Sequence, residues 1–87
     1  MKIAEGYELK QMGEHYLVMQ GSERFLFALN ETGAFLWKGM QSGLSKEELR
    51  ESLCREYEAD PEDMPMIAQD VEEFLAQLSQ RGVLEED

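Results

Sequence analysis

The 87-residue chain has little cysteine and histidine, and each scarcity excludes a class of site. Its single cysteine, Cys54, cannot form an internal disulfide or a zinc site built from cysteine pairs. Its single histidine, His15, excludes any site that needs two imidazoles. No stretch approaches the ~18 apolar residues of a membrane span, and the first residues lack the apolar core of a secretory signal. We therefore expect a cytoplasmic protein with no metal site, no cofactor and no membrane contact.

Basic side chains are also scarce, because eight Lys and Arg stand against 19 Asp and Glu and give a net charge of −11. Proteins that bind nucleic acids draw most of their non-specific affinity from Lys and Arg on phosphates, so this balance argues against a nucleic-acid partner. The acid is unevenly distributed: residues 1–44 carry a net charge of −1, and residues 45–87 carry −10. The same boundary separates a strand-like from a helix-like pattern of apolar residues.

The first half of the chain reads as three short strands joined by turns. Alternating or apolar runs over residues 7–12, 15–19 and 24–29 are separated by Gly13-Glu14 and by Gln20-Gly21-Ser22-Glu23. Connections this short predict an antiparallel meander.

The second half reads as three helices, each with a start signal. Asn30 can cap the first, Ser45 and Glu48 form a capping box for the second, and Asp60-Pro61 opens the third. The third helix carries a continuous apolar stripe and would end at Gly82; the stripe is Met64, Ile67, Ala68, Val71, Phe74, Leu75 and Leu78. We therefore predict a single α+β domain over residues 1–87, with the order β-β-β-α-α-α.

No arrangement of side chains in the sequence indicates catalysis. The chain has no glycine-rich phosphate loop and no nucleophile motif, and its carboxylate pairs stand at helix starts or on polar helix faces. We expect no catalytic residue and a protein that is not an enzyme.

The predicted third strand is apolar on both faces, although side chains alternate from one face of a strand to the other. One face should pack on the helices. The other is either covered by helices and strand twist, or borders a groove that a partner fills. If the strand lies at the sheet edge, its unpaired N–H and C=O groups form a template for an added strand.

Three motifs follow one another along the chain. They are Leu29-Asn30-Glu31-Thr32 followed by Leu36-Trp37, then Leu44-Ser45-Lys46-Glu47-Glu48-Leu49 with Leu53 and Tyr57, and finally Asp70-Val71-Glu72-Glu73-Phe74-Leu75 through Arg81-Gly82-Val83-Leu84. Together with the order and spacing of the elements, these motifs resemble the PqqD family over roughly residues 7–84. The resemblance implies a winged-helix-like fold, as in RiPP recognition elements. These domains bind the leader segment of a ribosomally made precursor peptide and present it to a modifying enzyme, often a radical SAM protein.

By this resemblance the leader would lie as an extra strand along the third strand, in a cleft against the third helix. The expected peptide-binding residues are Arg24, Phe25, Leu26, Phe27, Ala28, Leu29, Ile67, Asp70, Val71, Phe74, Gln77 and Leu78. Leaders of this class are often acidic, and the helical half carries −10. Either the bound segment here is neutral or basic, or Arg24 and Lys38 give local relief.

Two other functions are compatible with the same elements. A winged-helix transcription regulator needs a basic recognition helix, but the second helix mixes its three bases with acids and the third has only Arg81. A self-associating assembly domain would pair its open edge with a second copy and form a homodimer.

Overall fold

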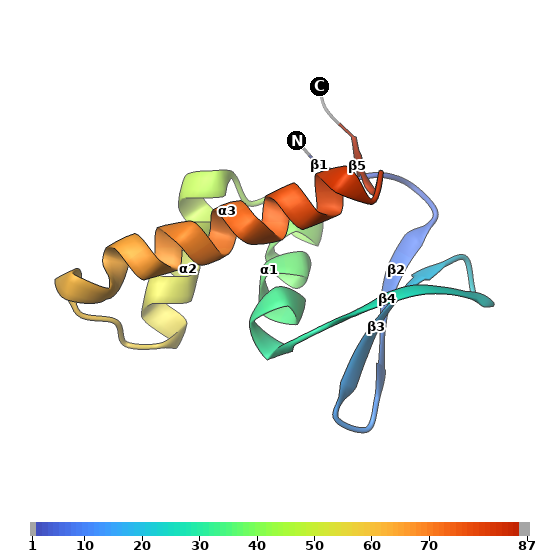
Figure 1. Ribbon diagram of the computed structural model, residues 1–87, viewed down its shortest axis with the longest axis horizontal. Helices are drawn as coiled ribbons and strands as arrows, with labels where there is room; N and C mark the ends of the chain where they lie inside the picture. The colour runs from blue at the N-terminus through green and yellow to red at the C-terminus, as the bar shows by residue number, and fades with distance from the viewer. Residues whose placement is uncertain (1, 86–87) are drawn as a thin grey trace.

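The computed structural model describes residues 2–85, with a three-stranded sheet on one side of the molecule and the helices on the other (Figure 1). The main elements are β2 (Tyr7–Met12), β3 (His15–Gln20), β4 (Arg24–Leu29), α1 (Glu31–Gln41), α2 (Lys46–Glu56) and α3 (Met64–Gln80). The sheet is antiparallel with the order β2-β3-β4, so β2 and β4 are its edges. The predicted α+β class and element order are confirmed. Residues 1, 86 and 87, which the predicted domain includes, lie outside the described residues.

Two strands of two residues each, β1 (Lys2–Ile3) and β5 (Leu84–Glu85), form a second small antiparallel sheet. The N–H of Ala4 also donates to the carbonyl oxygen of Val83 at 2.9 Å. Such short strands have no period to detect, and each finds its partner at the opposite end of the chain.

The start of the third helix differs from the prediction. Residues Pro61–Asp63 form a 3₁₀ turn, η1, and α3 begins only at Met64. The carboxylate of Asp63 accepts the backbone N–H of Asp60 at 3.2 Å, which satisfies an amide at the start of this turn. A second proline, Pro65, then occupies the first turn of α3, where a missing N–H costs nothing.

The two predicted caps of α1 and α2 are present. The Oδ1 of Asn30 accepts the N–H of Gly33 at 2.7 Å. At the start of α2, the Oγ of Ser45 accepts the N–H of Glu48 at 3.2 Å, and the Glu48 carboxylate accepts the N–H of Ser45 at 3.0 Å. The hydrogen bond from the Ser45 backbone N–H to the carboxylate is the main reason that the pKa of Glu48 is lowered, and the Ser45 side chain adds to the effect.

The core lies between one face of the sheet and the three helices. Its largest fully buried side chains are Trp37, Leu36, Leu49, Leu53, Leu78, Val18, Val71 and Val83. The predicted stripe of α3 supplies five buried residues, namely Ile67, Val71, Phe74, Leu75 and Leu78. Burial of this stripe fixes the rotation of α3 about its axis, and hence which of its polar residues reach the edge of the sheet.

An irregularity in β4 separates its two phenylalanines. Phe27 pairs with Val18 and Phe25 pairs with Met19, so Leu26 is an extra residue of the kind found in a β-bulge. Phe27 consequently enters the core at 6% exposure, whereas Phe25 remains 54% exposed. Because Val18 is a core residue and its neighbour Met19 points to the opposite face, Phe25 lies on the face away from the helices.

Candidate functional site

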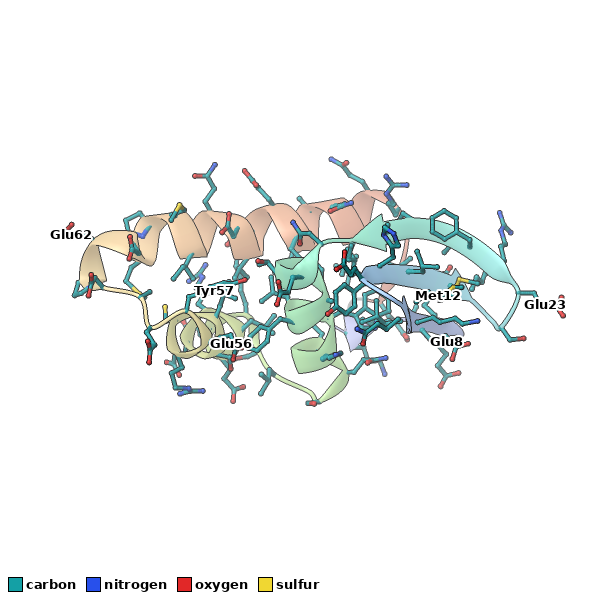
Figure 2. All side chains as sticks on the ribbon, turned by 90° about the horizontal axis from the view of Figure 1, so that it is seen from below. Glu8, Met12, Glu23, Glu56, Tyr57 and Glu62 are labelled. Atoms are coloured by element: carbon teal, nitrogen blue, oxygen red, sulfur yellow. The ribbon has the colours of Figure 1, made fainter. Side chains whose placement is uncertain are left out.

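Two hollows follow one another between β4 and α3, and the first of them meets the first turn of α1. One part, of about 330 Å³, is lined by Ala28, Leu29, Asn30, Thr32, Gly33, Leu36, Asp70, Glu73, Phe74 and Gln77. The other part, of about 430 Å³, is lined by Leu26, Phe27, Gln80 and Arg81. Figure 2 shows β4 leading from the turn at Glu23 toward the helices and passing beside the end of α3. We call these residues the β4–α3 groove.

The groove has an apolar floor and a polar rim. Leu29, Leu36 and Phe74 are buried at its floor, while Asp70 and Glu73 are exposed on its rim. Such a cross-section suits an extended chain that directs alternate side chains inward.

One edge of β4 is paired with β3, and the opposite edge faces the groove. In an antiparallel ladder the residues that flank a two-residue turn form a hydrogen-bonded pair, and such pairs alternate along the strands. The bond from the N–H of Gly21 to the oxygen of Gly6, 2.8 Å long, agrees with this alternation. In β3, the residues whose backbone groups do not bond to β2, among them Tyr16 and Val18, bond to β4 instead. Their partners in β4 are Leu29 and Phe27, so the backbone groups of these two residues point to β3. The N–H and C=O of Ala28 then point to the open edge.

The structure brings seven of the twelve predicted residues into the groove: Leu26, Phe27, Ala28, Leu29, Asp70, Phe74 and Gln77. Ile67, Val71 and Leu78 are at most 4% exposed and belong to the core instead. Arg24 and Phe25 are exposed on β4 but do not line the groove. The apolar stripe of α3 shows which face of the helix is buried, but it does not show which edge of that face lies beside the sheet. The expected residues of α3 therefore include both groove and core residues.

Sequence reasoning missed seven lining residues: Asn30, Thr32, Gly33, Leu36, Glu73, Gln80 and Arg81. The sequence does indicate the missed residues of α3, because Glu73 and Arg81 each lie four residues from the predicted Gln77 and therefore on the same helix face. It does not indicate the α1 residues, because their position depends on how the start of α1 packs beside the end of β4.

The two ends of the groove carry opposite charge. Asp70 and Glu73 line the part beside the start of α1, whereas Arg81 lines the part beside the middle of β4. The Arg81 guanidinium lies 4.7 Å from the centre of the Phe27 ring, a distance at which cation and ring attract each other. The groove is therefore acidic at one end and basic at the other.

The acid that faces α2 is neutralised. Glu72 forms ion pairs with Lys46 and with Arg50, the second at 2.9 Å. The hydrogen bond from Lys46 is the main reason that the pKa of Glu72 is lowered, and Arg50 adds to the effect. Within residues 2–85, by contrast, no base forms an ion pair with Asp70 or Glu73.

A separate hollow of about 160 Å³ lies between β3, α1 and α2 and is lined by Tyr16, Glu31, Ala34, Phe35, Lys38, Glu56 and Tyr57. The hydroxyl oxygens of Thr32 and Tyr57 lie 2.5 Å apart beside it. Tyr57 and Glu56 are labelled in Figure 2, where they project from the end of α2. This hollow lacks an unpaired strand edge, so the β4–α3 groove remains the candidate site.

The comparisons with known proteins agree with the predicted resemblance. Residues 14–84 match the family described as "Coenzyme PQQ synthesis protein D (PqqD)". The chain belongs to the PqqD family. The matched segment runs from the β2–β3 turn to the start of β5, so every groove residue of this PqqD-family chain lies within it.

A solved structure described as "TbiB1 in Complex with the TbiA(beta) Leader Peptide" is similar to this PqqD-family chain, with a TM-score of 0.81 and 24% sequence identity. The similarity covers 100% of this chain and 98% of the other. At this level of identity the likeness shows a common fold. Among curated proteins, no sequence matches the chain.

Within residues 2–85, no helix has the length and apolar character needed to cross a membrane. In the same part of the chain, His, Cys, Asp and Glu side chains form no group of three that could hold a metal ion.

Proposed function

We propose that this chain binds the leader segment of a ribosomally made precursor peptide and presents it to a separate modifying enzyme, of the radical SAM type. The open edge of β4 inside the β4–α3 groove is the observation that carries the proposal. Membership of the PqqD family supports it, as does the similar fold of a protein described in complex with a leader peptide.

In this proposal the leader adds a fourth strand to the sheet beside β4. The backbone groups of Ala28 bond to the peptide, which supplies sequence-independent affinity. Selectivity comes from side chains that enter the groove over Phe74 and beside Arg81. The chain itself acts without catalysis and without a cofactor, as a single cytoplasmic unit over residues 1–87 that holds the peptide for another protein.

The two alternatives account for fewer observations. A DNA-binding regulator would need free bases on a helix, but two of the three bases of α2 are paired with Glu72. A homodimer would use the same open edge, so self-association and peptide binding would compete for β4.

The test is a titration of the ¹⁵N-labelled protein with the leader half of the short peptide encoded beside its gene. We expect shifts in the ¹⁵N–¹H spectrum to gather on residues 26–29 and on the groove face of α3. Ala28→Pro should lose binding by at least tenfold, because it removes the N–H that faces the open edge while sparing the β3 ladder. Gln11→Pro is the matched control, since the same alternation directs its N–H outward at the far edge, on β2.

Both variants should keep the circular dichroism spectrum of the wild type. A folded Ala28→Pro variant that binds the leader as well as Gln11→Pro would contradict strand addition at β4. A well-dispersed spectrum that the leader does not change would contradict leader recognition by the isolated chain.

A further inference from the structure

We infer that the peptide segment held in the β4–α3 groove carries charge of both signs, with a basic residue beside Asp70 and Glu73 and an acidic residue beside Arg81. This inference rests on the proposed function and names the kind of peptide that the site selects. It is drawn from the charges along the groove, the partners of each charged group and the length of α3 between them.

The acidic end of the groove has charge available for a ligand. Asp70 and Glu73 are exposed on the groove face of α3, and among residues 2–85 the only hydrogen-bond donor to the Glu73 carboxylate is the side-chain amide of Gln69, at 3.0 Å. Glu72, which precedes Glu73 and faces α2, forms ion pairs with both Lys46 and Arg50. A Lys or Arg of a bound peptide would therefore meet two carboxylates that no base within residues 2–85 neutralises.

The basic end is held in place by the ring beneath it. Arg81 lies over Phe27 at 4.7 Å, which positions the guanidinium at the groove wall. A guanidinium stacked on a ring keeps its N–H donors free at its edge, where they can bond to both oxygens of a carboxylate. An Asp or Glu of the peptide would therefore find a preset partner there.

The geometry sets the spacing between the two charges. Asp70 and Glu73 precede Arg81 by 11 and 8 residues of α3 and its C-cap, which span roughly 12–16 Å at about 1.5 Å per residue. An extended strand covers that span in about four or five residues. The groove linings also show that β4 and α3 run in opposite directions, since Leu26 and Phe27 lie by Arg81 while Leu29 lies by Asp70. Because β2, β3 and β4 pair antiparallel, the inference places the added strand antiparallel to β4, so that the peptide presents its basic residue before its acidic one.

This charge pattern resolves the conflict between an acidic recognition domain and an acidic peptide. A segment that follows the pattern is repelled by neither end of the groove. A uniformly acidic segment, in contrast, would be repelled by the carboxylates of Asp70 and Glu73. Exposed charges of this kind contribute mainly to selectivity and association rate. We expect them to discriminate among peptides whose backbone contacts with β4 are the same.

The test is a selection of phage-displayed random dodecapeptides on the wild-type protein. Only peptides that lose binding to Ala28→Pro are retained, because those peptides use the open edge of β4. We expect retained peptides to be enriched in Lys or Arg at one position and in Asp or Glu about four or five residues later. Selection on Asp70→Asn/Glu73→Gln should lose the basic preference, and selection on Arg81→Gln the acidic one. Glu72→Gln is the matched control and should keep both.

Replacing the basic residue of one retained peptide by Gln should weaken its binding to the wild type about threefold to tenfold, and to Asp70→Asn/Glu73→Gln less than twofold. Retained peptides without this pattern, or with the pattern reversed in order, overturn the inference and leave strand addition standing. A selection in which no peptide depends on Ala28 overturns the proposed function and the inference with it.

Discussion

At the scale of single residues, the neighbours of a carboxylate decide its role. Glu72 and Glu73 are adjacent on α3, but the first contacts Lys46 and Arg50 of α2 and the second lines the groove. Glu72 therefore joins two helices, whereas Glu73 is available to a ligand. A one-residue step rotates a side chain by about 100° around the helix, which is enough to separate a structural acid from a binding one.

The ion pairs of Glu72 predict a pH dependence of stability. Because the pKa of Glu72 is lowered in the folded state, its contribution is present above the unfolded pKa and is lost as the pH falls through the lower, folded value. We expect the free energy of unfolding of Glu72→Gln to fall less steeply than that of the wild type as the pH drops below 4.5. Urea unfolding followed by circular dichroism at several pH values measures this. A slope for Glu72→Gln equal to that of the wild type would show that the ion pairs do not form in solution.

At the scale of elements, the end of α3 determines where the chain leaves the helical layer. The N–H of Gly82 donates to Ser79 and the N–H of Val83 donates to Leu78, the two bonds of a Schellman motif, and Gly82 has φ +74°. This end places the fully buried Val83 in the core and leads into β5.

The same motif predicts that Gly82→Ala destabilises the protein by about 1 kcal/mol, because an L-residue is strained at this positive φ. Apart from Gly82 and its two chain neighbours, no described residue has an atom within 4 Å of the position that an added Cβ would occupy, so the cost arises from the backbone alone. Gly82→Asn should cost less, since asparagine tolerates the left-handed region better than alanine. Urea midpoints of the three proteins compare them. Equal losses for Ala and Asn would indicate that the side chain, and not the backbone, is responsible.

Elements held by local bonds were predictable from the sequence, whereas features that depend on distant pairing were not. The cap at Asn30 and the box at Ser45 join residues three apart, so composition and order indicate them. The extra residue Leu26 depends on how β3 and β4 align, and neither strand alone reveals it. For this reason the sequence indicates that the third strand is apolar on both faces, but it does not indicate that Phe25 is exposed while Phe27 is buried.

At the scale of the whole molecule, the groove is formed by three elements that only the tertiary fold brings together. The apolar third strand indicated its β4 side, and the resemblance to the PqqD family indicated its α3 side. On α3, the expected Ile67, Val71 and Leu78 lie in the core, whereas Glu73 and Arg81 line the groove. The contribution of α1 depends on a packing contact that has no local pattern. The sequence thus indicated the elements of the site better than the residues on them.

The distribution of charge over the molecule predicts opposite effects of salt on folding and on binding. Fourteen of the 19 acids follow residue 44, and nine of them lie on α2, η1 and α3, where the repulsion between like charges destabilises the folded chain. Sodium chloride screens that repulsion over a Debye length that falls from ~10 Å at 0.1 M to ~3 Å at 1 M. We therefore expect the urea midpoint to rise with salt over this range. The few exposed ion pairs, which salt weakens, contribute too little to reverse that trend.

Binding of a peptide with the charge pattern inferred for the β4–α3 groove should change in the other direction. The same screening weakens the attraction of its basic residue to Asp70 and Glu73, and of its acidic residue to Arg81. Anisotropy titrations should show affinity falling about threefold to tenfold over the salt range in which the fold gains stability. The control is the same peptide with both charges replaced by Gln, whose binding should hold steady or strengthen as the fold does. If salt changed the binding of both peptides equally, the charges at the two ends of the groove would have no part in recognition, and backbone pairing with β4 would account for all of it.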